Sequence, residues 1–346
     1  MTSIDRRHLL AAAASLAIAR SATAQTLPPH EQELYGAAKK EGELTWYTGQ
    51  LSAETSEGVG AGFTRRFPGI KVNVVRSTSQ VAFQRLSQDM RAGVAQCDIF
   101  SSTDISHSTF LKRSGKYLKY KPVNEAQMLP AARDIDPDGY YITSYLGVYL
   151  MGNQTRLAPQ PPLSWKEALD PKWKNALAIG HPGYSGAIGI LAVQLRKMYG
   201  WDYFKSLEKN SPQIGRSSED PVAVMNAGER SVGLGVPTGT MLLSMSRGNP
   251  LALIYPTDGT LLVRSPSGIP SNAPHPNAAK LFQEFTASAD FSTTTGRYFE
   301  LPLRADVPPP PGSKPLDQIK LVYPTPEEIE KGVPEVKELW RDTFGV

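Results

Sequence analysis

Short β-strand patterns alternate with helix-length segments along most of this sequence, and this alternation limits the possible folds more than any other feature. Apolar and polar residues alternate in strand-like segments, which lie at 43–50, 70–76 and 97–101. After the second of these, Ala82 and Leu86 lie four positions apart, as residues on one face of an amphipathic helix do. The order strand, helix, strand, helix, strand predicts an α/β fold with a parallel sheet.

The middle and the end of the chain repeat this theme. Strand, loop and helix follow one another in residues 176–195 and again in 229–248. Residues 250–266 predict two strands joined by Asp-Gly, and residues 275–288 predict a helix with one apolar face. The C-terminal segment 325–344 predicts separate helical pieces at the end of the chain. The second piece carries four large apolar residues, Val336, Leu339, Trp340 and Phe344.

Small hydroxyl residues and glycines follow the end of one predicted strand after another. In open α/β sheets, ligands bind beyond the carboxyl ends of the strands, where the first N–H groups of the following helices are free. Serine and threonine also cap helices without any ligand, and for a single loop capping is the simpler explanation. Because five such loops occur, we predict that together they line a polar ligand cleft. The predicted ligand-binding residues are Thr48, Gly49, Ser77, Thr78, Ser79, Ser102, Thr103, Tyr184, Ser185, Gly186, Ala187, Pro237 and Thr238.

The segment HPGYSGAIGI (181–190) concentrates three glycines at one strand-to-helix junction. A plain turn requires one or two glycines, so three around Ser185 predict that some group approaches the backbone closely there. A ligand, a catalytic centre and a tightly packed neighbouring element are the three alternatives. Tyr184 either covers the ligand or packs as a surface aromatic residue.

Residues 1–24 have the features of an export signal. Arg6 and Arg7 precede an alanine-rich apolar run, and Ala-Thr-Ala at 22–24 forms a cleavage site of small residues. The run is shorter than the roughly 20 residues that cross a bilayer. The arginine pair predicts twin-arginine export with cleavage near Ala24, and an ordinary Sec signal is the alternative. Either route predicts a periplasmic location.

Charge and cysteine content exclude some classes of partner. The formal net charge of +4 includes three arginines and one aspartate of the signal, so the mature chain is close to neutral. No basic block occurs, and nucleic acid is therefore not expected as a partner. The single cysteine, Cys97, cannot form an internal disulfide, so the exported fold depends on its core. The histidines are scattered, and we predict neither a bound metal nor a cofactor.

Several segments together resemble the periplasmic solute-binding proteins of ABC importers, extracellular solute-binding family 1, in the branch that includes the ferric-ion-binding proteins. They are WYTGQ, FTRRFPGIKVNVV, CDIFSSTD, PLSWKEALDPKWKNALAIG and HPNAAKLFQEFTAS, in this order along nearly all of the mature chain. The resemblance implies a type II periplasmic binding protein, an α/β fold of two lobes. Each lobe is a mixed β-sheet flanked by helices, and the lobes close on a ligand in the cleft between them.

The resemblance also implies a division of the chain and a set of partners. After the signal peptide, residues 25–140 and about 256–295 form the first lobe. Residues from about 141 to 255 and 296–346 form the second lobe. A protein of this family binds a small-molecule solute and delivers it to an inner-membrane ABC permease and its ATPase. We therefore expect a monomer without enzymatic activity.

The positions of the family's iron ligands carry other residues in this chain. The family histidine falls on Leu51, the glutamate on Thr103, and the adjacent tyrosine pair on Thr238 and Gly239. Ferric iron requires anionic oxygen donors, which these side chains lack, so we do not expect iron binding. The family's anion anchor, a Ser-Gly-Ala segment at a helix N-terminus, matches residues 185–187.

We therefore predict a binding protein that captures a small anionic organic solute, such as a carboxylate, a phosphonate or a phosphate ester. Arg76, Arg216 and Arg264 lie near predicted loop ends and are candidates for pairing with it. A ferric-iron-binding protein is the alternative within the family. An exported serine hydrolase is the alternative of another class, because GYSGA is close to a nucleophile elbow at Ser185 and His275 follows as a candidate base.

Overall fold

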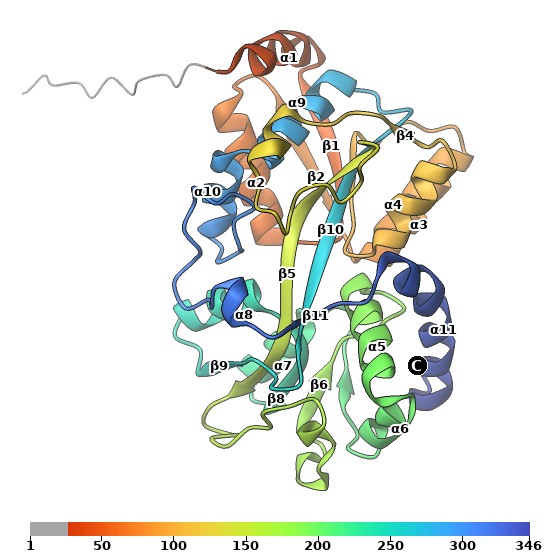
Figure 1. Ribbon diagram of the computed structural model, residues 1–346, viewed down its shortest axis with the longest axis vertical. Helices are drawn as coiled ribbons and strands as arrows, with labels where there is room; N and C mark the ends of the chain where they lie inside the picture. Colours follow the sequence, from red (N-terminus) through yellow and green to blue (C-terminus); the bar gives the residue numbers. More distant parts are fainter. Residues whose placement is uncertain (1–26) are drawn as a thin grey trace, which may run out of the picture.

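The computed structural model describes residues 27–346, and the predicted export signal at 1–24 lies outside the described residues. Within the described part, eleven strands form one mixed sheet, in which β5 (Tyr141–Gln154) and β10 (Thr260–Pro270) pair antiparallel at the centre. The strand order along the main path is β2-β1-β3-β10-β5-β8-β6-β7. Figure 1 shows these two long strands connecting an upper and a lower group of elements, which we call the first and the second lobe.

The first lobe is built on parallel strands β1, β2 and β3. Trp46 of β1 and Phe63 of α2 both pack on Phe282 of α9, with ring centroids 5.2 and 5.3 Å apart. A helix from late in the sequence thus completes a core that starts near the N-terminus. The elements of this lobe are α1 (Pro29–Glu41), β1 (Glu43–Thr48), α2 (Ala53–Arg66), β2 (Lys71–Arg76), α3 (Ser79–Arg91), β3 (Ile99–Ser101), α4 (Ile105–Arg113), β4 (Tyr117–Leu118), η1 (Val123–Gln127), α9 (Pro276–Thr286) and α10 (Ala289–Gly296).

The second lobe is built on β6, which pairs in parallel with β7 and β8. Phe204 of α6 and Trp340 of α11 meet in its core, with ring centroids 5.5 Å apart. The elements of this lobe and its surface segments are η2 (Glu167–Leu169), η3 (Pro171–Trp173), β6 (Leu177–Ile179), α5 (Gly186–Tyr199), α6 (Asp202–Glu208), β7 (Gln213–Ile214), α7 (Asp220–Asn226), β8 (Val232–Pro237), α8 (Thr238–Ser246), β9 (Leu251–Ile254), η4 (Leu316–Gln318), β11 (Leu321–Val322) and α11 (Pro326–Phe344).

The sheet is mixed, as the family resemblance implied, and not parallel throughout, as the strand-helix alternation alone predicted. The parallel strands lie in the outer parts, and the antiparallel pairs involve the central strands β5 and β10. The two strands joined by Asp-Gly both form, but they do not pair with each other. Instead, both pair with β5: β9 with residues 151–154 and β10 with residues 141–149. The two strands therefore pair with successive parts of the same long strand.

The C-terminal segment forms one helix, α11, and not the separate helical pieces that we expected. The side chains of Thr325 and Glu328 make a capping box at its start. Pro334 inside the helix removes one backbone hydrogen bond. The helix continues because Val336 and Trp340 are buried, and α11 packs on α5 and α6. It also contacts α4, so this helix touches both lobes.

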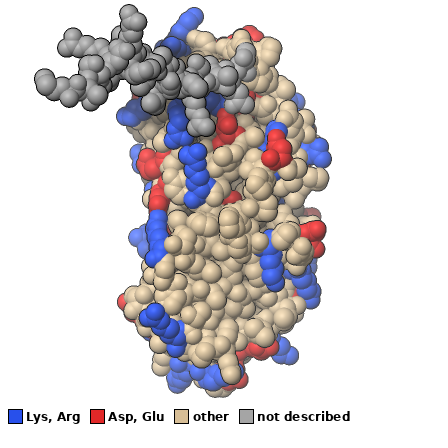
Figure 2. Space-filling view, turned by 90° about the vertical axis from the view of Figure 1, so that its left-hand side faces the viewer, with Lys and Arg blue, Asp and Glu red and all other residues tan. Residues whose placement is uncertain are grey.

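Figure 2 shows one face of the molecule, on which Lys, Arg, Asp and Glu lie in the upper half and along the edges, while uncharged residues cover much of the lower half. None of the helices between residues 27 and 346 combines the length and the apolar character that crossing a membrane requires. The lobe boundaries predicted from the sequence stay a prediction.

Candidate ligand-binding site

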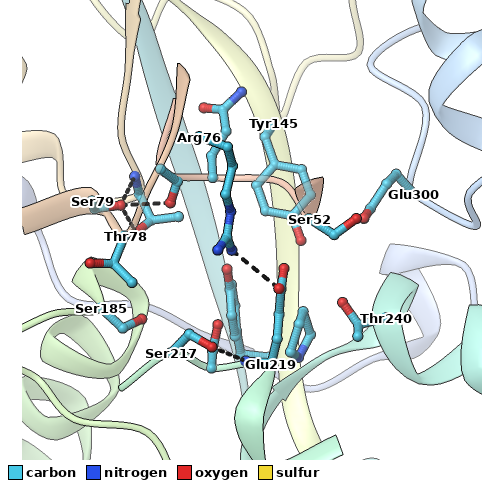
Figure 3. Close-up of a pocket in the computed structure, with 16 residues that line it drawn as sticks. Ser52, Arg76, Thr78, Ser79, Tyr145, Ser185, Ser217, Glu219, Thr240 and Glu300 are labelled. Carbon is cyan, nitrogen blue, oxygen red and sulfur yellow. Dashed lines mark hydrogen bonds and ion pairs between the residues drawn. The ribbon is translucent and has the colours of Figure 1, made fainter. Parts of the chain in front are cut away.

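A cleft between the lobes collects loops that follow strands of both lobes (Figure 3). Its lining residues are Gly49, Gln50, Ser52, Arg76, Thr78, Ser79, Thr103, Tyr145, Tyr149, Ser185, Ser217, Ser218, Glu219, Pro237, Thr240 and Glu300. The free space at its centre is about 20 Å³, which holds about one water molecule. An organic solute therefore requires the lobes or the lining side chains to move apart before it binds.

Three helices start at this cleft. Thr78 is the N-cap of α3, Ser185 is the N-cap of α5, and α8 follows Pro237. The first N–H groups of each helix have no intrahelical acceptor, and together they carry a partial positive charge. The cleft thus receives hydrogen-bond donors from α3 of the first lobe and from α5 and α8 of the second lobe.

Ser79 and Thr103 line the cleft, but their hydroxyl groups are engaged within the first lobe. Ser79 Oγ donates to the carbonyl oxygen of Gly49 at 2.7 Å and accepts from the N–H of Thr103 at 3.0 Å. Because the Ser79 proton is already donated, Thr103 Oγ1 is the donor in the 2.8 Å contact between the two hydroxyls. These two residues fasten the loops after β1, β2 and β3 to one another and have no hydroxyl proton left for a ligand.

Gln50 and Thr78 differ from that pair, because each has a buried donor without a partner. Gln50 Nε2 and Thr78 Oγ1 make no hydrogen bond within residues 27–346. Gln50 Oε1 accepts from Ser144 Oγ at 3.0 Å, which fixes the amide and leaves its nitrogen free. An unsatisfied buried polar group costs about 1–3 kcal/mol. These two groups therefore mark where an acceptor atom of a ligand is most favourable.

The glycine loop lies at the lobe interface, and its glycines face protein. A Cβ atom at Gly186 would come within 2.6 Å of Thr103 Oγ1 and 2.8 Å of the backbone nitrogen of Asp104, both in the first lobe. A Cβ at Gly183 would meet the ring of His181, and one at Gly189 would meet Val333 of α11. Because residue 186 has no side chain, the lobes can approach each other closely there. Of the three explanations for the glycine-rich loop, this favours a tightly packed neighbouring element.

Two polar contacts hold the lobes together at the cleft. The N–H of Gln80 donates to the carbonyl oxygen of Tyr184 at 3.2 Å. Arg76 Nη2 donates to Glu219 Oε2 at 3.1 Å, and both side chains are about one-quarter exposed. Arg76 is fixed further by the carbonyl oxygen of Leu51, 3.1 Å from its Nε. The structure is therefore a closed arrangement in which an ion pair crosses the cleft.

The structure places some of the predicted site residues in this lining and others outside it. Six predicted residues lie in it, namely Gly49, Thr78, Ser79, Thr103, Ser185 and Pro237. Seven lie outside it, namely Thr48, Ser77, Ser102, Tyr184, Gly186, Ala187 and Thr238. Thr238 Oγ1 donates to the carbonyl oxygen of Val148 at 2.8 Å, and Ser102 Oγ lies 2.9 Å from His107 Nδ1. Such hydroxyls stabilise the fold, as the capping alternative supposed.

Of the three candidate arginines, one lies in the cleft. Arg76 lines it, whereas Arg264 donates to the carbonyl oxygen of Arg133 at 2.6 Å, outside the lining. Arg216 lies over the ring of Tyr184, 4.6 Å from the centroid. Tyr184 and Arg216 thus pack on each other outside the lining, which favours the surface-packing alternative for this tyrosine.

The sequence reasoning missed the acidic and aromatic part of the site. Tyr145 and Tyr149 flank Gly147 on one face of β5, and a Cβ at 147 would collide with both rings. Alternation along the strand was the available signal, because residues 145, 147 and 149 share a face. Glu219 and Glu300 complete this part. Glu219 directly precedes α7, and Glu300 follows α10. Neither residue lies in a recognisable sequence motif.

Burial and mutual repulsion shift the pKa values of these acids. Burial, with the neighbouring Glu219 carboxylate, raises the pKa of Glu300 to about 8, and the nearby Tyr145 hydroxyl opposes the shift. Burial also raises the pKa of Glu219, and Arg76 acts in the opposite direction. Burial, with the charge of Glu300, raises the pKa values of Tyr145 and Tyr149 well above 10. Glu300 therefore carries a proton at neutral pH in this closed arrangement.

A family model described as "Bacterial extracellular solute-binding protein" matches residues 97–319, more than half of the chain. The chain belongs to this family. This solute-binding protein is 24% identical over 284 residues to a "Putative 2-aminoethylphosphonate-binding periplasmic protein" of Salmonella typhimurium, a match that covers 78% of this chain and 77% of the relative. The family prediction is thereby confirmed.

Solved structures show the same fold. The periplasmic binding protein AfuA from Actinobacillus pleuropneumoniae, with exogenous fructose-6-phosphate bound, superposes with a TM-score of 0.80 at 21% identity, covering 88% of this chain and 99% of that chain. Iron-bound HitA from Pseudomonas aeruginosa superposes with a TM-score of 0.74 at 20% identity, covering 87% and 99%. The predicted two-lobe α/β architecture of a type II binding protein is thereby confirmed.

The geometry bears differently on the two alternative functions of this solute-binding protein. Residues 27–346 contain no group of three His, Cys, Asp or Glu side chains that could hold a metal ion, but two tyrosines, Tyr145 and Tyr149, line the cleft beside its two acids. The candidate base of a hydrolase, His275, is paired with Asp98 in the first lobe at 2.9 Å and does not line the cleft. Ser185 Oγ instead accepts from the N–H of Ile188 as the cap of α5.

Proposed function

We propose that this solute-binding protein is the periplasmic binding component of an ABC importer and captures a small anionic organic solute between its lobes. A carboxylate, a phosphonate or a phosphate ester is the acidic group. The observation that carries this proposal is the pair of buried donors without acceptors, Gln50 Nε2 and Thr78 Oγ1, in the lining of the cleft. An acidic group that reaches either donor supplies the acceptor that this donor lacks.

The helix ends support the same ligand chemistry. The N-termini of α3 and α5 approach the cleft from opposite lobes, and an anion there interacts favourably with their free N–H groups. Ser185 Oγ accepts a hydrogen bond from its own helix and keeps its proton for the ligand. A solute that bridges the two helix ends therefore stabilises an arrangement in which both lobes contact it.

The named ligands of similar proteins fit this class. The Salmonella relative carries the name of a phosphonate-binding protein, and the AfuA structure contains a sugar phosphate. The proposal includes an inner-membrane permease with its ATPase as partners, a monomeric state, and lobes with the boundaries given in the sequence analysis. It also includes twin-arginine export with cleavage near Ala24.

A thermal-shift screen of the mature protein tests this proposal. The panel contains carboxylates, phosphonates, phosphate esters, amines and ferric citrate. A true ligand at 100 times its Kd adds about 2.7 kcal/mol to the free energy of unfolding. We expect the stabilising compounds to carry an acidic group. Stabilisation by ferric citrate alone, or by amines without an acidic group alone, would contradict the proposal.

The substitution Thr78→Val sharpens this test, because valine has the shape of threonine without the hydroxyl. The Thr78 side chain makes no hydrogen bond in the protein, so the ligand-free stability stays the same or rises. Affinity for the acidic ligand falls about 10- to 150-fold if the lost bond to a charged group is worth 1.5–3 kcal/mol. Thr293→Val, on the exposed face of α10, is the matched control.

A further inference from the structure

The cleft contains two carboxyl groups and one cationic side chain. Three charged residues line it, namely Arg76, Glu219 and Glu300. Arg76 pairs with Glu219, whereas Glu300 has no cationic partner within residues 27–346 and is only 5% exposed. A buried carboxylate without a partner is costly in a folded protein. A function that brings a positive group to Glu300 would explain its retention there.

The backbone around Glu300 is arranged to hold its carboxylate in the cleft. A Cβ atom at Gly239 would collide with the Glu300 carboxylate, so glycine at 239 makes room for this group. Phe299, the preceding residue, has a φ of 63°, which is unusual for a bulky side chain. In Figure 3 the Glu300 carboxylate extends toward Ser52 and Tyr145. The glycine at 239 and the unusual backbone at Phe299 thus hold the Glu300 carboxyl group in the cleft. An acid on the surface requires neither.

The acid lies at the other end of the cleft from the free hydroxyls. Figure 3 shows Thr78 and Ser185 on one side, Glu300 with Thr240 on the other, and the side chain of Arg76 between them. A solute with an acidic group alone adds negative charge beside Glu219 and leaves Glu300 without a cationic partner. An ammonium group on the same solute offsets that charge and gives Glu300 a partner.

We propose that the solute is zwitterionic, with an ammonium group that binds Glu300 and Glu219 while its acidic group binds at the Thr78 end. This inference rests on the proposed function and narrows its solute class to amine-bearing carboxylates, phosphonates or phosphate esters. Opening of the cleft separates Arg76 from Glu219. Arg76 is then available to the acidic group, and Glu219 to the ammonium group, so one internal ion pair is exchanged for two with the solute.

A proton is expected to leave Glu300 when the solute binds. Burial and Glu219 raise the pKa of Glu300 to about 8, and a bound ammonium group lowers it again. The other titratable groups that face Glu300 are Tyr145 and Tyr149, which stay protonated. At the rim, Glu54 and Arg247 pair with each other at 2.6 Å. Binding of an amine at pH 7 therefore releases a proton that an isosteric solute without the amine does not release.

Calorimetric titration with three matched pairs of probes tests the inference. The pairs are 2-aminoethylphosphonate with propylphosphonate, 4-aminobutyrate with pentanoate, and phosphoethanolamine with propyl phosphate. Each pair differs by an ammonium group in place of a methyl group. We expect at least one amine to bind about 10- to 150-fold more tightly than its methyl partner, the range for a hydrogen bond to a charged group. Titration in two buffers of different ionisation enthalpy measures the released proton.

The variants separate this inference from the function on which it rests. Glu300→Gln should reduce the preference for the amine and abolish the proton release. Glu57→Gln, exposed on α2, should change neither. If the amine and its methyl partner bind equally in every pair, the inference is wrong. The anion-binding function then still holds if Thr78→Val weakens the binding of both the amine and its methyl partner. If no probe and no acidic compound of the thermal-shift panel binds, both proposals are wrong.

Discussion

Replacing Glu300 by glutamine should make the ligand-free protein more stable at alkaline pH and leave it nearly unchanged at acidic pH. The folded protein holds the pKa of Glu300 at about 8, against 4.5 for the ordinary group. Between these values the unfolded chain has lost a proton that the folded protein keeps, so wild-type stability falls as pH rises through this window. The free energy of unfolding changes by about 1.4 kcal/mol per pH unit in this window, so wild type loses at most about 5 kcal/mol of stability across it.

Urea unfolding of refolded, ligand-free protein at pH 5 and pH 8.5 measures this effect. The free energy of unfolding of Glu300→Gln should exceed that of wild type by several kcal/mol more at pH 8.5 than at pH 5. The exposed Glu57→Gln provides the matched control, since it makes the same chemical change in solvent. If the two variants differ from wild type by amounts that do not vary with pH, the burial argument for Glu300 is wrong.

The remaining predictions concern export, metal binding and lobe closure. Replacing Arg6 and Arg7 with lysine should abolish the periplasmic fraction in cell fractionation, and undiminished export would indicate the Sec route. Titration with ferric citrate should produce no phenolate-to-iron absorption band, and a band with submicromolar affinity would restore the iron alternative. Gly186→Val places a side chain against Thr103 and Asp104, 2.6 and 2.8 Å from the added Cβ; it should weaken solute binding more than tenfold without unfolding the protein. Small-angle scattering of this variant should then show no contraction with solute, and normal closure would refute the role given to the glycine.

The repeating units of the fold could be predicted from the sequence because their signals are local. Alternation in β1 and the apolar face of α3 follow from which side of each element is buried. The order of strands could not be derived in that way. The pairing of β10 with β3 and β5 depends on contacts between residues more than 100 positions apart, such as Gly268 with Phe100. The family resemblance implied that the sheets are mixed, but neither it nor the alternation of strands and helices gave the strand order.

The site was predictable where a helix starts and unpredictable where side chains meet across the cleft. Thr78 and Ser185 were recognised because N-cap positions have a characteristic composition. Whether such a hydroxyl is free depends on its neighbours, and Ser79 is engaged by residues from two other loops. Glu219 and Glu300 come from segments far apart in the sequence, and their mutual repulsion exists only in the folded protein. Their proximity therefore became visible only with the structure.

A crystal structure of the mature protein with the solute identified by screening is the most direct test of the central claim. The account predicts an acidic group within 2.7–3.2 Å of Gln50 Nε2 and Thr78 Oγ1, the usual hydrogen-bond range. It also predicts that the amine of the solute lies beside Glu300. A metal ion coordinated in the cleft, or an acidic group bound away from Gln50 and Thr78, would contradict the account.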